Sequence, residues 1–170
     1  MRQRRSSTGF SLIELMVVIA IIAILLSLAT LNFNQWQRKS QIERQTRELM
    51  ADLNTARTES IYRKQSHALI MNTDGLGYIL RRYSSPDEKR TSTVQPAEII
   101  LNKGVHYQFT KGSGSSIGDR IFQFDITGFT NDWDTIRVNP VGSGAAFDCV
   151  VVSASRINIG QMSGGTCVQN

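Results

Sequence analysis

Apolar residues are concentrated in one run near the start of the chain. From Leu15 to Leu31 only two polar residues interrupt this run, and no charged residue occurs between Glu14 and Arg38. A helix over the charge-free residues 15–37 would be about 35 Å long, which is enough to cross a hydrocarbon core of about 30 Å. The pattern therefore predicts a membrane-spanning helix, and a buried core helix of a soluble domain is the alternative.

A helical pattern of a different kind follows directly. Residues 38–64 contain no glycine and no proline. Apolar or small residues recur there at spacings of three, four and seven: Ile42, Thr46, Leu49, Leu53, Ala56 and Ser60. Charged residues fill the other faces, which predicts an amphipathic helix. We expect one continuous helix from about residue 10 to residue 64, whose second half needs a partner surface for its apolar stripe.

The remaining residues, 65–170, have the pattern of short β-strands. Two apolar runs flank Asn72-Thr73-Asp74-Gly75, a sequence that favours a hairpin turn. Further short runs follow between segments rich in glycine, serine, asparagine and proline: AEIIL, VHYQF, RIFQFDI, DTIRV, DCVVVS and RINI. An antiparallel sheet with one face on the helix stripe is the simplest architecture, so the predicted fold class is α+β.

A short basic segment precedes the apolar run. Three arginines stand before Gly9-Phe10, and no other basic residue occurs until Arg38. A secretory signal peptide has its cleavage site after the apolar stretch, whereas the small residue Gly9 lies before it. Cleavage at this position would leave the anchor on the mature protein. The positive-inside rule predicts a cytoplasmic N-terminus and a C-terminal domain on the other side of the membrane.

The chain has two cysteines, Cys149 and Cys167. On the oxidising side of a bacterial-type membrane they predict a disulfide, closing a loop of about 18 residues and contributing about 3 kcal/mol in the chain-entropy model. Two unpaired buried thiols are the alternative. A zinc site is disfavoured, because no histidine or second cysteine pair stands at ligand spacing.

The sequence TGFSLIELMVVIAIIAILLSLA resembles the N-terminal signature of type IV pilins and type II secretion pseudopilins. A second stretch, NFNQWQRKSQIERQTRELMADLNTARTESIYRKQ, resembles the subgroup of minor pilins and pseudopilins called GspH, FimT and FimU. The motif ARTES (residues 56–60), the stretch FDITGFTNDWDTIRV and a final cysteine after CVVVS are typical of that subgroup. The resemblance implies a type IV pilin-like fold, in which a long N-terminal helix packs on an antiparallel β-sheet domain.

The resemblance also implies processing. A prepilin peptidase would cut between Gly9 and Phe10 and methylate the new amine of Phe10. The chain would then have four parts: a cleaved cytoplasmic leader (1–9), a transmembrane and filament-core helix (10–37), an amphipathic helix half (38–64) and a periplasmic β-sheet domain (65–170). Loss of three of the 19 basic residues, against 14 acidic ones, lowers the net charge from +5 to +2 (19 − 3 − 14 = 2), so the mature surface is not strongly basic.

Glu14 lies one helical turn after Phe10, close to the boundary of the apolar run. A carboxylate at the centre of a bilayer costs about 2.5–3.5 kcal/mol, and less near the interface. In filaments of this family, as the resemblance implies, Glu14 pairs with the N-terminal amine of a neighbour, whose unperturbed pKa of about 7.7–8.0 leaves it mostly cationic. The pairing would favour one axial stagger between subunits. The alternative is that Glu14 stabilises its own helix N-terminus, by about 0.3–1 kcal/mol.

One loop bears on nucleic-acid binding. Some FimT proteins bind DNA through a C-terminal Gly-Arg-x-Arg loop. The corresponding stretch here is SASRINI, in which Arg156 is present, while Ser155 replaces the glycine and Asn158 the second arginine. Arg156 is therefore the candidate DNA contact, in a loop with half the charge of that motif.

The sequence contains no motif that indicates catalysis. Asp125 and the NDWD segment could offer oxygen ligands to calcium, but the spacing does not match an EF-hand and a solvated turn is favoured. His67 and His106 are isolated, and neither has a serine or cysteine nucleophile at recognisable motif spacing. We predict no enzyme, no cofactor and no metal. The chain is then the substrate of a peptidase and not a catalyst.

Three functions remain. The first, favoured by the subgroup signature, is a minor pilin or pseudopilin that initiates or caps a type IV pilus or a type II secretion pseudopilus. Such a protein sits in the bacterial inner membrane as a single-pass protein, and its partners are the prepilin peptidase and other pilins. The second is a DNA-binding, FimT-like minor pilin used in natural transformation. The third is a major pilin that forms the filament shaft.

Overall fold

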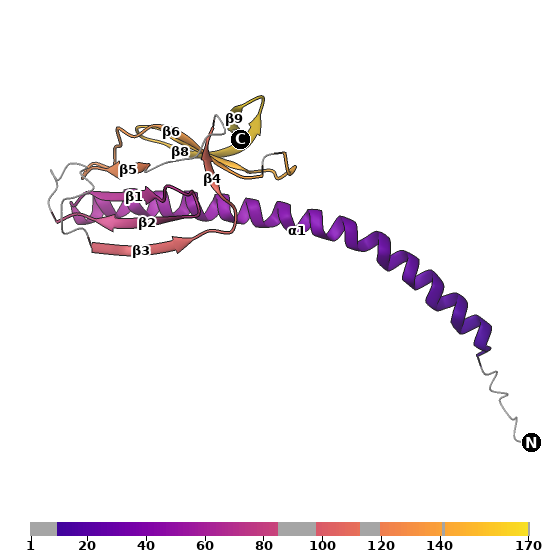
Figure 1. Cartoon of the computed structure of the whole chain (residues 1–170). Helices are drawn as coiled ribbons and strands as arrows, with labels where there is room; N and C mark the ends of the chain where they lie inside the picture. The colour runs from indigo at the N-terminus through magenta and orange to yellow at the C-terminus, as the bar shows by residue number, and fades with distance from the viewer. Residues whose placement is uncertain (1–9, 85–97, 113–119, 141, 170) are drawn as a thin grey trace, which may run out of the picture. The chain divides into compact units, whose positions relative to one another are not determined.

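The computed structural model describes residues 10–84, 98–112, 120–140 and 142–169, and in helix residues 28–32 it describes the backbone only. Within these ranges one helix precedes nine strands (Figure 1): α1 (Leu12–Arg63), β1 (His67–Met71), β2 (Gly77–Arg82), β3 (Glu98–Gly104), β4 (Phe109–Lys111), β5 (Ile121–Phe124), β6 (Asp134–Val138), β7 (Cys149–Val152), β8 (Ile157–Ser163) and β9 (Thr166–Gln169). The single long helix and the following strands confirm the predicted α+β class.

The chain divides into two units, residues 1–37 and 38–170, and helix α1 contributes to both. In the first unit, the described large apolar side chains between Phe10 and Leu26 are all exposed. Among the residues whose side chains are described, no helix is long and apolar enough to span a membrane.

The second unit contains two antiparallel sheets, where the sequence predicted one. Their strand orders are β3-β2-β1-β5 and β4-β6-β7-β8-β9. The chain leaves the first sheet after β3, starts the second with β4, and then returns so that β5 pairs with β1. The predicted hairpin between β1 and β2 is present, with Met71 opposite Tyr78 and with Gly75 at a φ of 69°.

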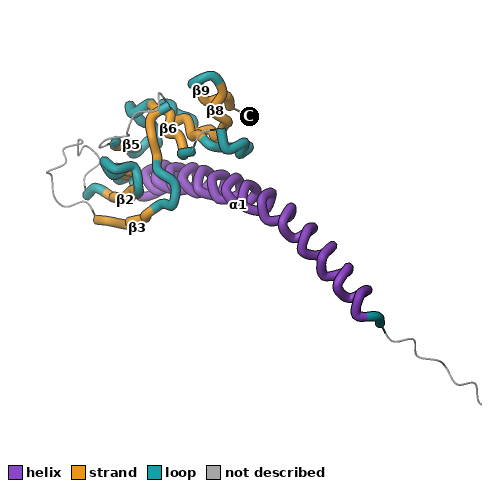
Figure 2. Tube along the Cα trace, turned by 45° about the vertical axis from the view of Figure 1, so that its right-hand side comes forward, coloured by secondary structure: helices purple, strands orange, loops and turns teal. Residues whose placement is uncertain are grey.

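The amphipathic stripe of α1 is the centre of the core. Ile42, Leu49, Leu53 and Ala56 are fully buried among side chains of both sheets. Figures 1 and 2 show the strands lying along the C-terminal part of α1. Because removal of apolar surface from water favours folding, burial of this stripe stabilises the packing of the helix on the strands.

The stripe also contains two polar residues, Thr46 and Ser60, and both are fully buried. The Thr46 hydroxyl lies 2.8 Å from the carbonyl oxygen of Ile42, and the Ser60 hydroxyl donates to the carbonyl oxygen of Arg57 at 2.7 Å. Because each hydroxyl is hydrogen-bonded to its own helix, its burial avoids the cost of an unsatisfied polar group.

Gln45 fastens the β3–β4 connection to the helix. This side chain is only 7% exposed. Its amide nitrogen donates to the carbonyl oxygen of Tyr107 at 2.5 Å, and its amide oxygen accepts from the Tyr107 backbone N–H at 2.9 Å. The side chain thus pairs with both backbone groups of one residue, as a neighbouring strand would, and satisfies them at the point where the chain passes from one sheet to the other.

A polar network crosses from α1 to the first sheet. The Tyr78 hydroxyl donates to the carboxylate of Asp52, and Lys103 lies 3.4 Å from Asp52 and 3.2 Å from Glu48. Burial, reinforced by the hydrogen bond to Asp52, raises the pKa of Tyr78 far above its usual value. The tyrosine therefore stays a neutral donor, and the network fixes the axial position of β2 and β3 on the helix.

His67 gives the domain a pH-dependent stability. The side chain is fully buried, its Nδ1 lies 2.9 Å from the carbonyl oxygen of Gln65, and its Nε2 has no hydrogen-bond partner in the described part of the chain. Burial lowers the pKa of His67, despite the favourable contact of its ring with Gln65. Neutral imidazole, with Nδ1–H donating, is therefore the form that the folded domain accommodates.

We expect acidification to destabilise the domain through His67. The unfolded chain binds this proton at a higher pH than the folded chain, so the contribution of His67 is intact above about pH 6.5 and is lost as the pH falls toward its lowered pKa. Urea unfolding from about pH 7.5 to about pH 5.5 measures this slope. His67→Gln should flatten it, and His106→Gln, which alters the exposed histidine, should not. Equal slopes in both variants would contradict the assignment.

Candidate functional site

The N-terminal turn of α1 carries the first group of candidate residues. The carbonyl oxygen of Ser11 accepts hydrogen bonds from the backbone N–H groups of Glu14 at 3.1 Å and of Leu15 at 3.2 Å, so Ser11 is the N-cap residue, directly before the first residue of α1. Ser11 and Glu14 have the Ser-x-x-Glu spacing of a capping box. A carboxylate in the first helical turn also interacts favourably with the helix dipole.

Little of this turn is covered by the described part of the chain. Phe10 and Leu12 are each 77% exposed, and Ile13 is 71% exposed. The exposed apolar side chains and the carboxylate of this turn can therefore interact with a membrane or with another helix. Gly9, on the other side of the predicted cleavage site, lies outside the described residues.

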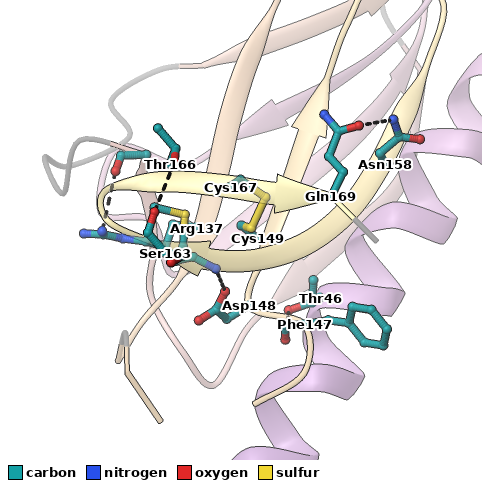
Figure 3. The surroundings of a disulfide bond; sticks show 12 residues. Thr46, Arg137, Phe147, Asp148, Cys149, Asn158, Ser163, Thr166, Cys167 and Gln169 are labelled. Carbon is teal, nitrogen blue, oxygen red and sulfur yellow. Dashed lines mark hydrogen bonds between the residues drawn. A yellow bond between two sulfur atoms is a disulfide. The ribbon is translucent and has the colours of Figure 1, made fainter. Parts of the chain in front are cut away.

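The second group is the disulfide between Cys149 of β7 and Cys167 of β9 (Figure 3). The bond crosses over β8, which lies between these two strands in the sheet. Gly160 of β8 makes this crossing feasible, because a Cβ atom there would lie 2.1 Å from the carbonyl oxygen of Val168 and 3.1 Å from the sulfur of Cys167. The disulfide thus ties the hairpin formed by β8 and β9 to β7, the buried central strand of the second sheet.

Asp148, next to the disulfide, holds the same hairpin (Figure 3). Its carboxylate accepts a hydrogen bond from the backbone N–H of Met162 at 2.7 Å, and its own N–H donates to the carbonyl oxygen of Gly160 at 3.0 Å. Only 2% of Asp148 is exposed, and burial raises the pKa of its carboxyl group. Because Asp148 is hydrogen-bonded to two residues of β8, it holds the hairpin against the end of β7.

The third group forms where the ARTES segment of α1 meets two loops. The Arg57 guanidinium donates to the carbonyl oxygen of Ser155, in the turn between β7 and β8. On the neighbouring loop, Gly128 has a φ of 80° and packs against Ile61 and the stem of Arg57. Segments that the sequence singled out separately, ARTES and FDITGFTND, therefore lie together in the fold.

Asp125 shapes the loop that contacts the helix. Its carboxylate accepts hydrogen bonds from the backbone N–H groups of Thr127 at 2.8 Å and of Phe129 at 3.1 Å, and from the Thr127 hydroxyl at 2.5 Å. Burial acts to raise the pKa of Asp125, but these donors outweigh it and lower the pKa. Asp125 is therefore occupied as the acceptor of its own turn, and no group of three or more metal-ligating side chains gathers in the described ranges.

The contact between Gly128 and Ile61 can be tested with a matched pair of glycines. Gly128→Ala places a methyl group at a positive φ, where its Cβ would lie 2.6 Å from Ile61 Cδ1. Gly142→Ala meets the same backbone cost, about 1–2 kcal/mol, at a φ of 78°, and its Cβ would have no described atom within 4 Å apart from its chain neighbours. We expect Gly128→Ala to lower the free energy of unfolding by about 1 kcal/mol more than Gly142→Ala in urea titrations. Equal losses would show that Ile61 does not hold this loop.

The candidate DNA contact, Arg156, lies in the turn between β7 and β8. Its side chain is exposed, and its carbonyl oxygen accepts from the Ser153 backbone N–H at 2.8 Å. Asn158, at the position of the second arginine of the DNA-binding motif, uses its amide to bind Gln169 at 2.7 Å. In the described part of this turn Arg156 is the one exposed cation.

The fold and the N-terminal segment together point to a class of protein. An N-terminal helix packed on antiparallel sheets is consistent with the type IV pilin-like fold. Residues 4–30 match the family model of the prokaryotic N-terminal methylation motif, which is the prepilin-type signal. This match supports a protein of type IV pilin or pseudopilin kind. None of the curated proteins and none of the solved structures matches the chain significantly.

The methylation motif has direct chemical implications. It implies processing by a prepilin peptidase and assembly with other pilins, and it points to a structural subunit in place of an enzyme. The motif is shared by pilins and pseudopilins, so membership of the GspH, FimT and FimU subgroup stays a prediction. DNA as a partner has no support from these comparisons.

Proposed function

We propose that this protein is a minor pilin or pseudopilin, a structural subunit that initiates or caps a type IV pilus or a type II secretion pseudopilus. The methylation motif at residues 4–30, leading into the long helix α1, is the observation that carries this proposal. The ARTES segment supports the minor class, since it resembles the corresponding segment of GspH, FimT and FimU.

In this proposal the chain begins as a single-pass protein of the bacterial inner membrane. The charge-free residues 15–37, preceded by three arginines, support an anchor with its N-terminus in the cytoplasm. The Cys149–Cys167 disulfide supports a periplasmic location for the β domain, because disulfides persist in oxidising compartments. After cleavage between Gly9 and Phe10, the anchor helix would leave the membrane and enter the core of the filament.

Processing depends on the residue before the cut. Gly9→Leu should abolish leader removal, because a bulky side chain at this position does not suit a peptidase that accepts glycine, and Gly9→Ala should slow it mildly. Immunoblots of cells with an active prepilin peptidase measure the two sizes. In cells without the peptidase, the unaltered chain should give a single band, and its size should equal that of the unprocessed Gly9→Leu chain. A mature-sized band from Gly9→Leu would count against this cleavage site.

The minor role is tested by stoichiometry. In sheared filaments we expect this chain at a small fraction of the shaft subunit, with filament number falling when the chain is removed. An amount equal to the shaft subunit would identify a major pilin instead. Quantitative mass spectrometry of purified filaments gives the ratio.

A further inference from the structure

Two aromatic side chains near the end of the apolar run, Phe33 and Trp36, form an exposed pair. They lie three residues apart on α1, their ring centroids are 6.1 Å apart, and the rings are tilted by 35°. Phe33 is 59% exposed and Trp36 is 64% exposed. Two large rings thus cover one another in part, while the described chain leaves most of their surface open.

The position of the pair along the helix matches the thickness of a bilayer. Trp36 follows Glu14 by 22 residues, which is about 33 Å along a helix axis, against a hydrocarbon core of about 30 Å. The residues between Glu14 and Trp36 carry no charge, and the first charge after them is Arg38. If Glu14 lies at the cytoplasmic boundary, the aromatic pair therefore lies at the opposite boundary.

The residues around the pair favour water and lipid headgroups over a dry protein contact. Asn34, Gln35 and Gln37 are all exposed, so the residues that flank the pair in the sequence carry hydrogen-bonding amides. Helices that pack closely within a membrane present small residues at their contact face. An aromatic pair set among amides is instead typical of the interface, where an indole keeps its ring in apolar surroundings and its N–H near water.

We propose that Phe33 and Trp36 form a phospholipid-binding site at the outer interface of the membrane, which sets the depth of the helix before filament assembly. This inference rests on the proposed membrane anchor. The ligand is the boundary region of a phospholipid, where the glycerol backbone meets the acyl chains. The alternative occupant, the helix of a second copy, is an outcome of the following test.

Tryptophan fluorescence in vesicles measures this depth. The full mature chain has two tryptophans, so Trp133→Phe leaves Trp36 as the only emitter. The chain is reconstituted into vesicles of phosphatidylethanolamine and phosphatidylglycerol that contain lipids brominated either near the glycerol or near the chain end. We expect stronger quenching by the shallow bromine than by the deep bromine, because an interfacial indole lies at the level of the lipid headgroups.

Two further variants make the result independent of any one substitution. Trp36→Phe leaves Trp133 as the only emitter, and its response to each bromine measures the background that does not come from the pair. Combining Phe33→Trp with Trp36→Phe and Trp133→Phe moves the emitter about 4.5 Å deeper along the helix, so the quenching ratio should shift toward the deep bromine. Flotation of each variant with the vesicles reports the anchor separately.

Each outcome has one meaning. Stronger quenching of Trp36 by the deep bromine, in a chain that floats with vesicles, would overturn the proposed site and leave the anchor intact. Absence of quenching in a floating chain would show that protein covers the pair, as in a complex of two copies. A chain that does not float would overturn the membrane anchor itself.

Discussion

Glu14→Leu should leave the chain in the membrane and exclude it from filaments. The substitution removes a carboxylate from the first turn of α1, where it makes membrane insertion slightly costly, so anchoring should be unchanged or improved. Under the proposed pairing of Glu14 with the N-terminal amine of a neighbour, the same change would remove the partner of that cationic amine in the filament. An unpaired buried amine is strongly disfavoured, by about 3–5 kcal/mol, which is enough to prevent entry.

The measurement is the fraction of the variant in sheared filaments relative to the fraction in membranes. Ile13→Leu is the matched control, because it changes the neighbouring residue with almost no change in side-chain volume. This variant should enter filaments normally. Glu14→Gln keeps a polar side chain but loses the charge, and it should be impaired as well. Normal entry of Glu14→Leu would show that Glu14 acts on its own helix N-terminus, where its contribution is about 0.3–1 kcal/mol.

Loss of the disulfide should be the largest change in stability. Cys167→Ser is expected to lower the free energy of unfolding by about 2–5 kcal/mol, because the unfolded chain regains the freedom of the closed loop. Cys167 lies in β9, and its disulfide to Cys149 is the covalent link between β9 and the buried strand β7. Urea unfolding of the chain in detergent, monitored by circular dichroism, gives the difference.

Two controls separate the bond from the cysteine side chains. The double variant Cys149→Ser with Cys167→Ser reports any cost of placing a hydroxyl at position 149, which is fully buried. Addition of a reductant to the unaltered chain should reproduce most of the loss. An unaltered midpoint under reducing conditions would show that the bond does not stabilise the domain.

Features written in one contiguous segment could be predicted from the sequence. The continuous helix follows from the absence of glycine and proline and from the stripe that includes Ile42 and Leu53, both fully buried. The β1–β2 hairpin follows from Asn72 and Gly75, which are its turn residues. In such cases the local pattern and the packing favour the same conformation.

Features that depend on two distant segments could not be predicted. The separation into two sheets arises because β5 pairs with β1 while β4 pairs with β6, and strand partners are not encoded within a strand. The pairing of Gln45 with Tyr107 joins residues 62 positions apart. A glutamine on a helix face otherwise indicates solvent exposure.

The candidate site shows the same division. Glu14 stands out in the sequence because a charge in an apolar run is unusual, and Gly9-Phe10 because a small residue precedes the run. The role of Gly160 could not be predicted, because it depends on the disulfide that crosses β8. The hydrogen bond from Arg57 to the carbonyl oxygen of Ser155 likewise depends on the packing of the β7–β8 turn on the helix.

The mass of the N-terminal peptide of the mature protein tests the central claim most directly. The chain is purified from membranes of cells with an active prepilin peptidase, digested and analysed by mass spectrometry. We expect a peptide that begins at Phe10 and carries one methyl group on its amine. A mature chain that keeps residues 1–9, or one that begins after the apolar run, would contradict its assignment to pilin-type processing.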